Sequence, residues 1–302
     1  MNKSKKVIVI LGPTAVGKTK FAVDLAYKFS GEIISADSRQ VYIGMDIGTG
    51  KDLSDYKFQN STIKHHLIDV VKPECEFNLY LFQNLFYQSL KDICEDKKLP
   101  ILVGGTGLYL SSVIQKYSIT KVDFNSERSK VLNNYSNEKL VEILLDTNPK
   151  LHNSTDLKDK NRIIKAILIA ESNEQSETPD ENIEFLIIGI FEDREIHKKM
   201  IRERLKLRLK SGMIEEVQNL LSIGISHDKL RFFGLEYKFV SQYLTGELNY
   251  NDMYQKLASA IIQFSKRQMT WFRKMEKEGI IINWMNSTDL IKAQSLISEF
   301  IK

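Results

Sequence analysis

The chain has few of the features that mark secreted or membrane proteins. Only two of its 302 residues are cysteines, Cys75 and Cys94. Two cysteines are too few for a disulfide framework or for the four ligands of a structural zinc site. No apolar segment approaches the length of a transmembrane helix, and the apolar run after the basic start stops at Gly12, too early for a signal peptide. We therefore expect a globular protein of the reducing cytoplasm, with no membrane partner.

The charge of the chain is nearly balanced, with a formal net charge of +4. Such a surplus alone does not indicate a nucleic-acid-binding surface. Its distribution is less even, because the segment from Arg194 to Lys210 holds eight basic residues and only two acidic ones. Apolar residues at helical spacing in this segment predict a helix. A solvated helix face and a surface for an anionic partner explain the basic run equally well.

Short apolar runs alternate with helical patterns along much of the chain, and hydrophobic residues make up 42% of it. This alternation predicts an α/β fold of the phosphate-loop type, with a mostly parallel sheet flanked by helices. Apolar residues at helical spacing predict long helices over Leu79 to Asp96 and Met253 to Lys277. The expected strands are Val7 to Leu11, Ile33 to Ala36, Leu67 to Val70, Ile101 to Val103 and Phe185 to Phe191.

Strand signals disappear between Ile119 and Asn182. Apolar residues such as Leu140, Leu144, Ile163 and Ile167 recur there at helical spacing, and a polar run follows them. We therefore expect a catalytic core formed by residues 1–118 and 183–302, with a helical insertion at 119–182.

The strongest motif is a phosphate-binding loop. It directly follows the first expected strand and precedes a helical pattern, a context that favours this interpretation over a chance glycine turn. Its glycines let backbone N–H groups converge on phosphate oxygens, and Lys18 adds a positive charge. The Thr19 hydroxyl is placed to ligate Mg²⁺. The loop consists of Gly12, Pro13, Thr14, Ala15, Val16, Gly17, Lys18 and Thr19.

Two further motifs follow expected strands. Asp37 comes directly after the second strand, and Thr106 lies in a glycine-rich turn after Ile101 to Val103. Because the carboxyl ends of parallel strands open onto one crevice, both residues are expected on the side of the phosphate loop. Asp37 could hold Mg²⁺ through water, accept a proton from a nucleophile, or cap a helix.

These motifs belong to an ordered set that resembles the tRNA dimethylallyltransferases and spans nearly the whole chain. Besides the phosphate loop, the matching segments are Gly31 to Tyr42, Gly44 to Lys51, His65 to Asp69, Gly104 to Tyr109, Asn161 to Ala166 and Lys266 to Arg273. The family transfers the dimethylallyl group of dimethylallyl diphosphate to N6 of an adenine beside the tRNA anticodon. The resemblance therefore implies an enzyme whose partners are dimethylallyl diphosphate and the tRNA anticodon stem-loop, with Mg²⁺ as cofactor. We expect a monomer.

The resemblance also implies roles for individual residues. Lys18, Thr19 and Arg231 would stabilise the leaving diphosphate, and Asp37 would accept the proton of the adenine amino group. The residues expected to contact tRNA are Asp37, Ser38, Arg39, Gln40, Thr106, Arg128, Asn161, Arg162, Ile163, Ile164 and Lys165.

The chain departs from the family pattern at two positions, one after the segment Arg231 to Gly234 that carries the family arginine and one in Asn161 to Ala166. Leu235 follows Gly234 where the family usually has tyrosine, and Lys165 stands where arginine is common. Lysine supplies a point charge without the two-pronged fork of arginine.

Two other classes of protein remain as alternatives. A small-molecule kinase would share the phosphate loop, the parallel sheet and a helical lid. A nucleotide-regulated RNA-binding module would use the loop only as a switch, and it gives no reason for Asp37 to face the loop.

Overall fold

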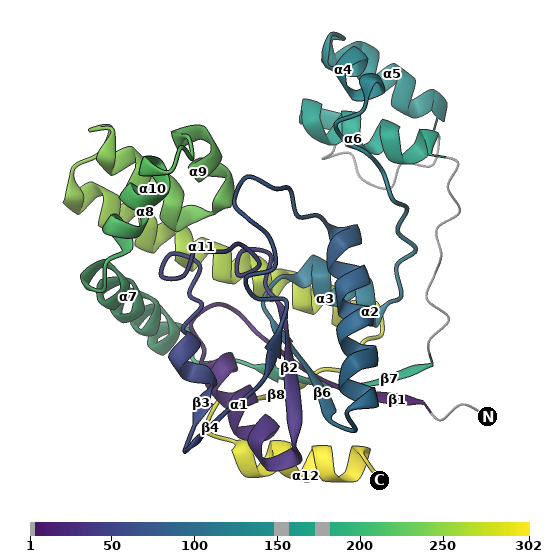
Figure 1. Ribbon diagram of the computed structural model, residues 1–302, viewed down its shortest axis with the longest axis vertical. Helices are drawn as coiled ribbons and strands as arrows, with labels where there is room; N and C mark the ends of the chain where they lie inside the picture. The colour runs from purple at the N-terminus through teal and green to yellow at the C-terminus, as the bar shows by residue number, and fades with distance from the viewer. Residues whose placement is uncertain (1–3, 148–156, 173–181) are drawn as a thin grey trace. The chain divides into compact units, whose positions relative to one another are not determined.

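The chain divides into two compact units. The computed structural model describes residues 4–147, 157–172 and 182–302 (Figure 1). The first unit comprises residues 1–115 and 180–302, and the second comprises residues 116–179. The insertion that the sequence predicts at residues 119–182 has nearly the same bounds as the second unit. Within the described residues, no helix is both long and apolar enough to cross a bilayer.

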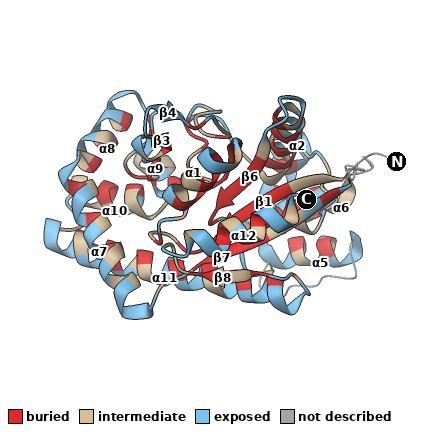
Figure 2. Cartoon of the chain, turned by 90° about the horizontal axis from the view of Figure 1, so that it is seen from below, coloured by how far each residue is buried: buried red, intermediate tan, exposed pale blue. Residues whose placement is uncertain are grey.

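A six-stranded parallel sheet forms the centre of the first unit. A sheet made only of parallel strands is covered on both faces, so its strands are rich in apolar residues. The inner strands are accordingly mostly buried, whereas the residues of the two edge strands are largely half-buried (Figure 2). This arrangement confirms the predicted α/β fold. In spatial order the strands are β5 (His65–His66), β2 (Gly31–Ala36), β6 (Leu99–Gly104), β1 (Lys5–Leu11), β7 (Ile183–Ile190) and β8 (Asn283–Met285).

The prediction of a strand at Leu67 to Val70 is wrong. The strand in this region is the two-residue β5, which ends at His66. Leu67 and Asp69 have positive φ angles of 63° and 54°, in the left-handed region that a strand excludes. The apolar run at Leu67 is therefore a turn that leads the chain away from the sheet edge.

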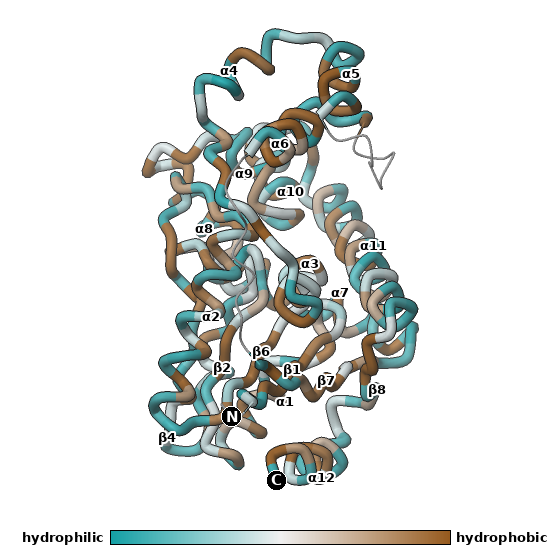
Figure 3. The backbone as a smooth tube through the Cα atoms, turned by 90° about the vertical axis from the view of Figure 1, so that its right-hand side faces the viewer, coloured by the Kyte–Doolittle hydropathy of each residue, from teal (hydrophilic) through white to brown (hydrophobic). Residues whose placement is uncertain are grey.

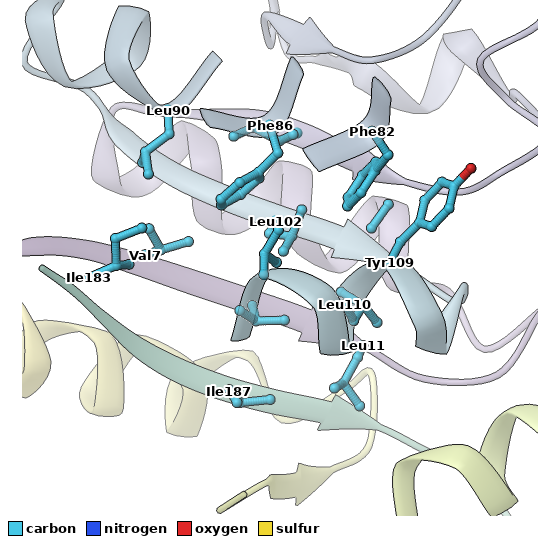
Figure 4. Packing of buried hydrophobic residues seen from close by; sticks show 14 of the residues in the cluster. Val7, Leu11, Phe82, Phe86, Leu90, Leu102, Tyr109, Leu110, Ile183 and Ile187 are labelled. Atoms are coloured by element: carbon cyan, nitrogen blue, oxygen red, sulfur yellow. The ribbon is translucent and has the colours of Figure 1, made fainter. Parts of the chain in front are cut away.

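One face of the sheet is covered by α2 (Leu79–Glu95), α3 (Gly107–Ile114) and the end of α11 (Tyr250–Lys277). Phe82, Phe86 and Leu90 of α2 point toward Leu102 of the sheet (Figure 4). The ring of Phe82 also stacks on Tyr109 of α3 at 4.1 Å between centroids. This packing fixes α3 directly after the carboxyl end of β6.

The opposite face is covered by α1 (Lys18–Phe29) and α12 (Leu290–Phe300). Phe21 and Leu25 of α1 and Ile297 of α12 are buried there with Tyr56 of the 3-10 helix η1 (Leu53–Tyr56). A short antiparallel hairpin of β3 (Lys57–Phe58) and β4 (Ser61–Thr62) follows η1. The position of α1 holds the phosphate loop at the carboxyl edge of the sheet.

A third hydrophobic cluster lies among helices beside the sheet. Tyr42 and Met45, from the segment after β2, are buried in it with Tyr237 and Leu257. Along α11 hydrophobic and hydrophilic positions alternate, so that one stripe faces this cluster (Figure 3). The other helices of the cluster are α7 (Arg194–Lys210), α8 (Met213–Ser222), α9 (His227–Phe233) and α10 (Leu235–Leu244).

The second unit has a small core of its own. Its helices are α4 (Glu127–Asn133), α5 (Asn137–Thr147) and α6 (Lys160–Glu171). Leu132, Leu140, Leu144, Ile163 and Ile167 are fully buried among them. The apolar residues at helical spacing in the sequence are therefore the core of this unit.

Candidate active site

A cavity of about 1200 Å³ opens at the carboxyl edge of the parallel sheet. Three strands end there, β1 at the phosphate loop, β2 at Asp37 and β6 at Gly105. Residues of α7, α9, α10 and α11 and of the segment from Asp46 to Tyr56 add to the lining. The edge at which parallel strands end is the usual ligand-binding side of an open α/β sheet.

The phosphate loop is shaped by its glycines and by Lys18. A Cβ atom at Gly12 would lie 2.3 Å from the carbonyl oxygen of Ile190, so only glycine fits between β1 and β7. The Lys18 ammonium donates a hydrogen bond to the carbonyl oxygen of Pro13 at 2.6 Å. Burial and the charge of Arg204 lower the pKa of Lys18 to about 7, although Asp37 opposes the shift. The loop is thus a site where an anion would relieve an unfavourable charge environment.

Two helices fix the loop at Thr14. The Thr14 N–H donates to Gln268 Oε1 at 2.9 Å, and Gln268 Nε2 donates to the carbonyl oxygen of Gly105 at 2.9 Å. On the other side, His197 Nε2 lies 2.7 Å from the carbonyl oxygen of Thr14. Gln268 therefore links the phosphate loop to the glycine turn after β6, and His197 links the loop to α7.

Asp37 lies in a turn that is joined to the glycine turn. Its Oδ1 accepts a hydrogen bond from the Arg39 N–H at 2.8 Å, and Thr106 Oγ1 accepts one from the Ser38 N–H at 3.1 Å. The interpretation of Asp37 as a helix cap is wrong, because the next helical segment begins only at Leu53. The structure thus places Asp37 and Thr106 side by side on the cavity lining.

A loop stabilised by charged side chains forms one wall of the cavity. Lys51 is buried and forms ion pairs with Asp46 and Asp69. Glu216 of α8 accepts hydrogen bonds from the N–H groups of Asp46, Ile47 and Gly48, at 2.7 to 2.9 Å. These contacts hold the wall in a defined position relative to the phosphate loop.

The structure brings most of the predicted core site residues to this cavity. Arg231 is among them, but its guanidinium forms an ion pair with Glu247 at 2.7 Å. Gly12, Pro13 and Val16 are buried behind the loop surface. The predicted side chains that line the cavity are Thr14, Ala15, Gly17, Lys18, Thr19, Asp37, Ser38, Arg39, Gln40, Thr106 and Arg231.

The remaining predicted residues lie in the second unit. Asn161, Arg162 and Lys165 are exposed on α6. Ile163 and Ile164 are instead buried in the core of that unit, at 0% and 3% exposure. Arg128 forms an ion pair with Glu171 at the end of α6.

Several residues of the cavity were not assigned a role from the sequence. Arg204 and Arg208, one helical turn apart on α7, both line it, as do Gln268 and Trp271 of α11. Phe232 is 55% exposed at the lining. The basic run on α7 is a signal for the two arginines. The matching segment Lys266 to Arg273 contains Gln268 and Trp271, but it does not indicate that Gln268 contacts the phosphate loop.

The residues around Thr19 are compatible with Mg²⁺. No group of three or more His, Cys, Asp or Glu residues in the described part of the chain could hold a metal ion on its own. Mg²⁺ does not require one, since it usually keeps several waters and binds one or two protein oxygens together with substrate phosphates. The Thr19 hydroxyl and the Asp37 carboxylate line the same cavity and supply oxygens of this kind.

Comparisons with known proteins agree on one family. The family model described as IPP transferase matches residues 40–275. A tRNA dimethylallyltransferase of Geotalea daltonii is 51% identical, over 93% of this chain and 90% of the relative, and one of Geotalea uraniireducens is 48% identical over 97% of each.

Solved structures give the same result. The tRNA isopentenylpyrophosphate transferase of Bacillus halodurans is 30% identical, with a TM-score of 0.70 over 98% of this chain and 97% of that one. A eukaryotic dimethylallyltransferase acting on tRNA is 25% identical, with a TM-score of 0.74 over 95% of this chain and 75% of that one.

Proposed function

This chain belongs to the tRNA dimethylallyltransferase family, and from that membership we propose the donor, the acceptor atom and the residues of its reaction. The chain is an enzyme that prenylates tRNA. We propose that it takes the dimethylallyl group from dimethylallyl diphosphate and transfers it to N6 of an adenine adjacent to the anticodon. The observation that carries this proposal is the convergence of the phosphate loop, Asp37 and Thr106 on one cavity.

The phosphate loop receives the diphosphate of the donor in this mechanism. Its backbone N–H groups, the N-terminus of α1 and the Lys18 ammonium stabilise the negative charge that grows as the allylic C–O bond breaks. The Thr19 hydroxyl would hold Mg²⁺, which would supply further positive charge to the diphosphate oxygens. Arg231 joins them by releasing Glu247, an exchange that an exposed ion pair allows at little cost.

Asp37 serves as the general base. The adenine amino nitrogen forms a bond to the allylic carbon, the electron pair of the C–O bond leaves with the diphosphate, and the Asp37 carboxylate takes the proton that the nitrogen loses. A carboxylate can accept such a proton, and support for this role is that Asp37 lines the same cavity as the phosphate loop.

The tRNA is recognised by residues of both units in this proposal. The target adenine must leave the stack of the anticodon loop to enter the cavity. Ser38, Arg39, Gln40 and Thr106 then contact nucleotides around it, and the exposed face of α6 contacts the tRNA elsewhere. We also propose a monomer that works in the cytoplasm, where its tRNA substrate is found.

Mass spectrometry of the tRNA product tests the proposal. Unmodified tRNA is incubated with the chain, dimethylallyl diphosphate and Mg²⁺, and the nucleosides are then analysed. The expected result is one dimethylallyl group on an adenosine next to the anticodon, accompanied by release of diphosphate. Absence of that product would refute the donor and the target. The relatives named above give the kinase alternative no support.

A further inference from the structure

Glu216 of α8 binds the loop that forms one wall of the cavity, and it does so with both oxygens of its carboxylate. Oε2 accepts hydrogen bonds from the N–H groups of Asp46 and Ile47, at 2.8 and 2.7 Å. Oε1 accepts one from the Gly48 N–H at 2.9 Å and one from the Tyr237 hydroxyl at 2.7 Å. Successive backbone N–H groups that converge on one point form a binding site for an anion. Glu216 supplies that anion from within the chain.

Tyr237 reaches this site because Gly48 has no side chain. A Cβ atom at Gly48 would lie 2.6 Å from Cζ of the Tyr237 ring, so a larger residue would push the ring away. Burial and the charge of Glu216 raise the pKa of Tyr237 well above its usual range, so the hydroxyl keeps the proton that it donates. The Glu216 carboxylate therefore accepts four hydrogen bonds, which fills its usual capacity.

The wall is also joined to the turn that carries Asp37. Gln40 Nε2 donates to the carbonyl oxygen of Gly50 at 3.1 Å, and Gln40 Oε1 accepts from the Ser35 hydroxyl at 3.2 Å. Gly50 belongs to the wall, since its N–H donates to the carbonyl oxygen of Ile47 at 3.2 Å. Ser35 and Gln40 lie on either side of Asp37 in the sequence. A displacement of the wall would therefore be passed on to the turn of Asp37.

We propose that Glu216 is a positioning residue for prenyl transfer, which sets the place of the Asp37 carboxylate through the cavity wall. This inference rests on the proposed function. Glu216 is not among the residues that line the cavity in the described part of the chain, so it acts through the wall rather than on a substrate. A general base must lie within hydrogen-bond distance of its proton, and a misplacement of about 1 Å can cost about a hundredfold in rate.

Single-turnover prenyl transfer with saturating dimethylallyl diphosphate, Mg²⁺ and tRNA tests this role. Glu216→Ala should lower the rate by roughly a hundredfold, since the N–H groups of the wall lose their acceptor. Glu216→Gln should lower it by roughly tenfold, because it keeps the shape and one acceptor oxygen but turns an amide NH₂ toward backbone donors. Tyr237→Phe removes one donor and should lower the rate less than Glu216→Gln does. Pyrophosphate affinity, measured by calorimetry with Mg²⁺ and without tRNA, should stay within about threefold of wild type.

Two substitutions on the same helix serve as controls. Glu215→Gln removes a charge from the exposed neighbouring residue and should leave the rate unchanged. Leu220→Ala shortens a buried side chain, so it lowers the melting temperature without removing a hydrogen bond of Glu216. Below its melting temperature Leu220→Ala should transfer at the wild-type rate. If it is instead as slow as Glu216→Gln, Glu216 only stabilises the fold and the proposal is overturned.

Two further results would also overturn the proposal. One is a folded Glu216→Gln variant whose transfer rate lies within twofold of wild type. The other is a loss of pyrophosphate affinity as large as the loss of rate, because the wall would then act on the donor rather than on Asp37. If Glu216→Ala fails to fold, Glu216→Gln alone decides by the twofold limit.

The same experiments keep this inference distinct from the proposed function. Wild-type protein that does not prenylate tRNA would refute the function, whatever the Glu216 variants do. Wild-type protein that prenylates tRNA, combined with Glu216 variants that transfer at the wild-type rate, would refute only the role of Glu216.

Discussion

Replacing Gln268 by alanine should disrupt the phosphate loop from a distance. The side chain is buried, at 8% exposure, and joins the Thr14 N–H to the Gly105 carbonyl oxygen. Gln268→Ala removes two hydrogen bonds and leaves the part-buried Thr14 N–H and the buried Gly105 carbonyl oxygen without their partner in the protein. Each net hydrogen bond is worth about 1 kcal/mol, and each unsatisfied buried group costs about 1 to 3 kcal/mol.

We therefore expect Gln268→Ala to lower the free energy of unfolding by about 3 kcal/mol. For a unit of this size that corresponds to a fall in melting temperature of roughly 6 to 12 °C. Donor binding should weaken as well, because the Thr14 amide loses the contact that orients it. Thermal unfolding followed by circular dichroism and calorimetry with dimethylallyl diphosphate in the absence of tRNA measure the two effects.

A second substitution and a control sharpen this test. Gln268→Glu keeps an acceptor for Thr14 but places a negative charge beside the loop, so it should weaken donor binding more than the alanine variant does. Gln263→Ala removes an exposed glutamine from the same helix and should change stability by less than about 0.5 kcal/mol. A Gln268→Ala variant with wild-type melting temperature and donor affinity would show that the two hydrogen bonds do not hold the loop.

Three more predictions address the chemistry and the tRNA. Lys18→Ala should remove about 3 kcal/mol or more of transition-state stabilisation, measured as a fall in kcat/KM for dimethylallyl diphosphate. A near-wild-type kcat/KM would contradict the role of Lys18 at the leaving group. Asp37→Ala should slow single-turnover transfer by roughly a hundredfold or more while donor and tRNA affinities stay nearly constant; weaker diphosphate binding that extra Mg²⁺ restores would instead indicate a metal ligand. The tRNA affinity should fall steeply between low and physiological salt, because Arg162, Lys165 and the basic face of α7 displace counterions, and a flat dependence would exclude these contacts.

Much of the fold could be predicted because a parallel sheet imposes a simple pattern on the sequence. The strands β1, β2, β6 and β7 are buried on both faces, so they read as short apolar runs between helical patterns. The run at Leu67 satisfies the same pattern without forming a strand, because nothing in its composition reveals the left-handed backbone of Leu67 and Asp69. The edge strand β8 has only three residues, too few to show a periodic pattern.

The site was predictable where its residues are contiguous or follow a strand directly. The phosphate loop, Asp37 and Thr106 each sit at the end of a strand, and the parallel topology then brings them together. Gln268 forms a hydrogen bond with Thr14, from which it is separated by 254 residues in the sequence. Arg204 contacts Thr14 over a separation of 190 residues. Such contacts depend on how α7 and α11 pack, which local sequence patterns do not determine.

The packing of α7 against the phosphate loop also explains why the site is costly without a ligand. Arg208 Nε and Nη2 are buried and lack a hydrogen-bond partner among the described residues, and burial together with the charge of Arg204 lowers the pKa of Arg208 to about 10. Asp52 and Glu236 offset part of this repulsion, at 4.0 and 3.6 Å from the guanidinium. A diphosphate beside Lys18 and Arg204 would bring the remaining negative charge. The repulsion among these cations lowers the stability of the free enzyme. A ligand that binds only the folded chain and neutralises the cations removes this repulsion, and the free energy gained contributes to donor affinity.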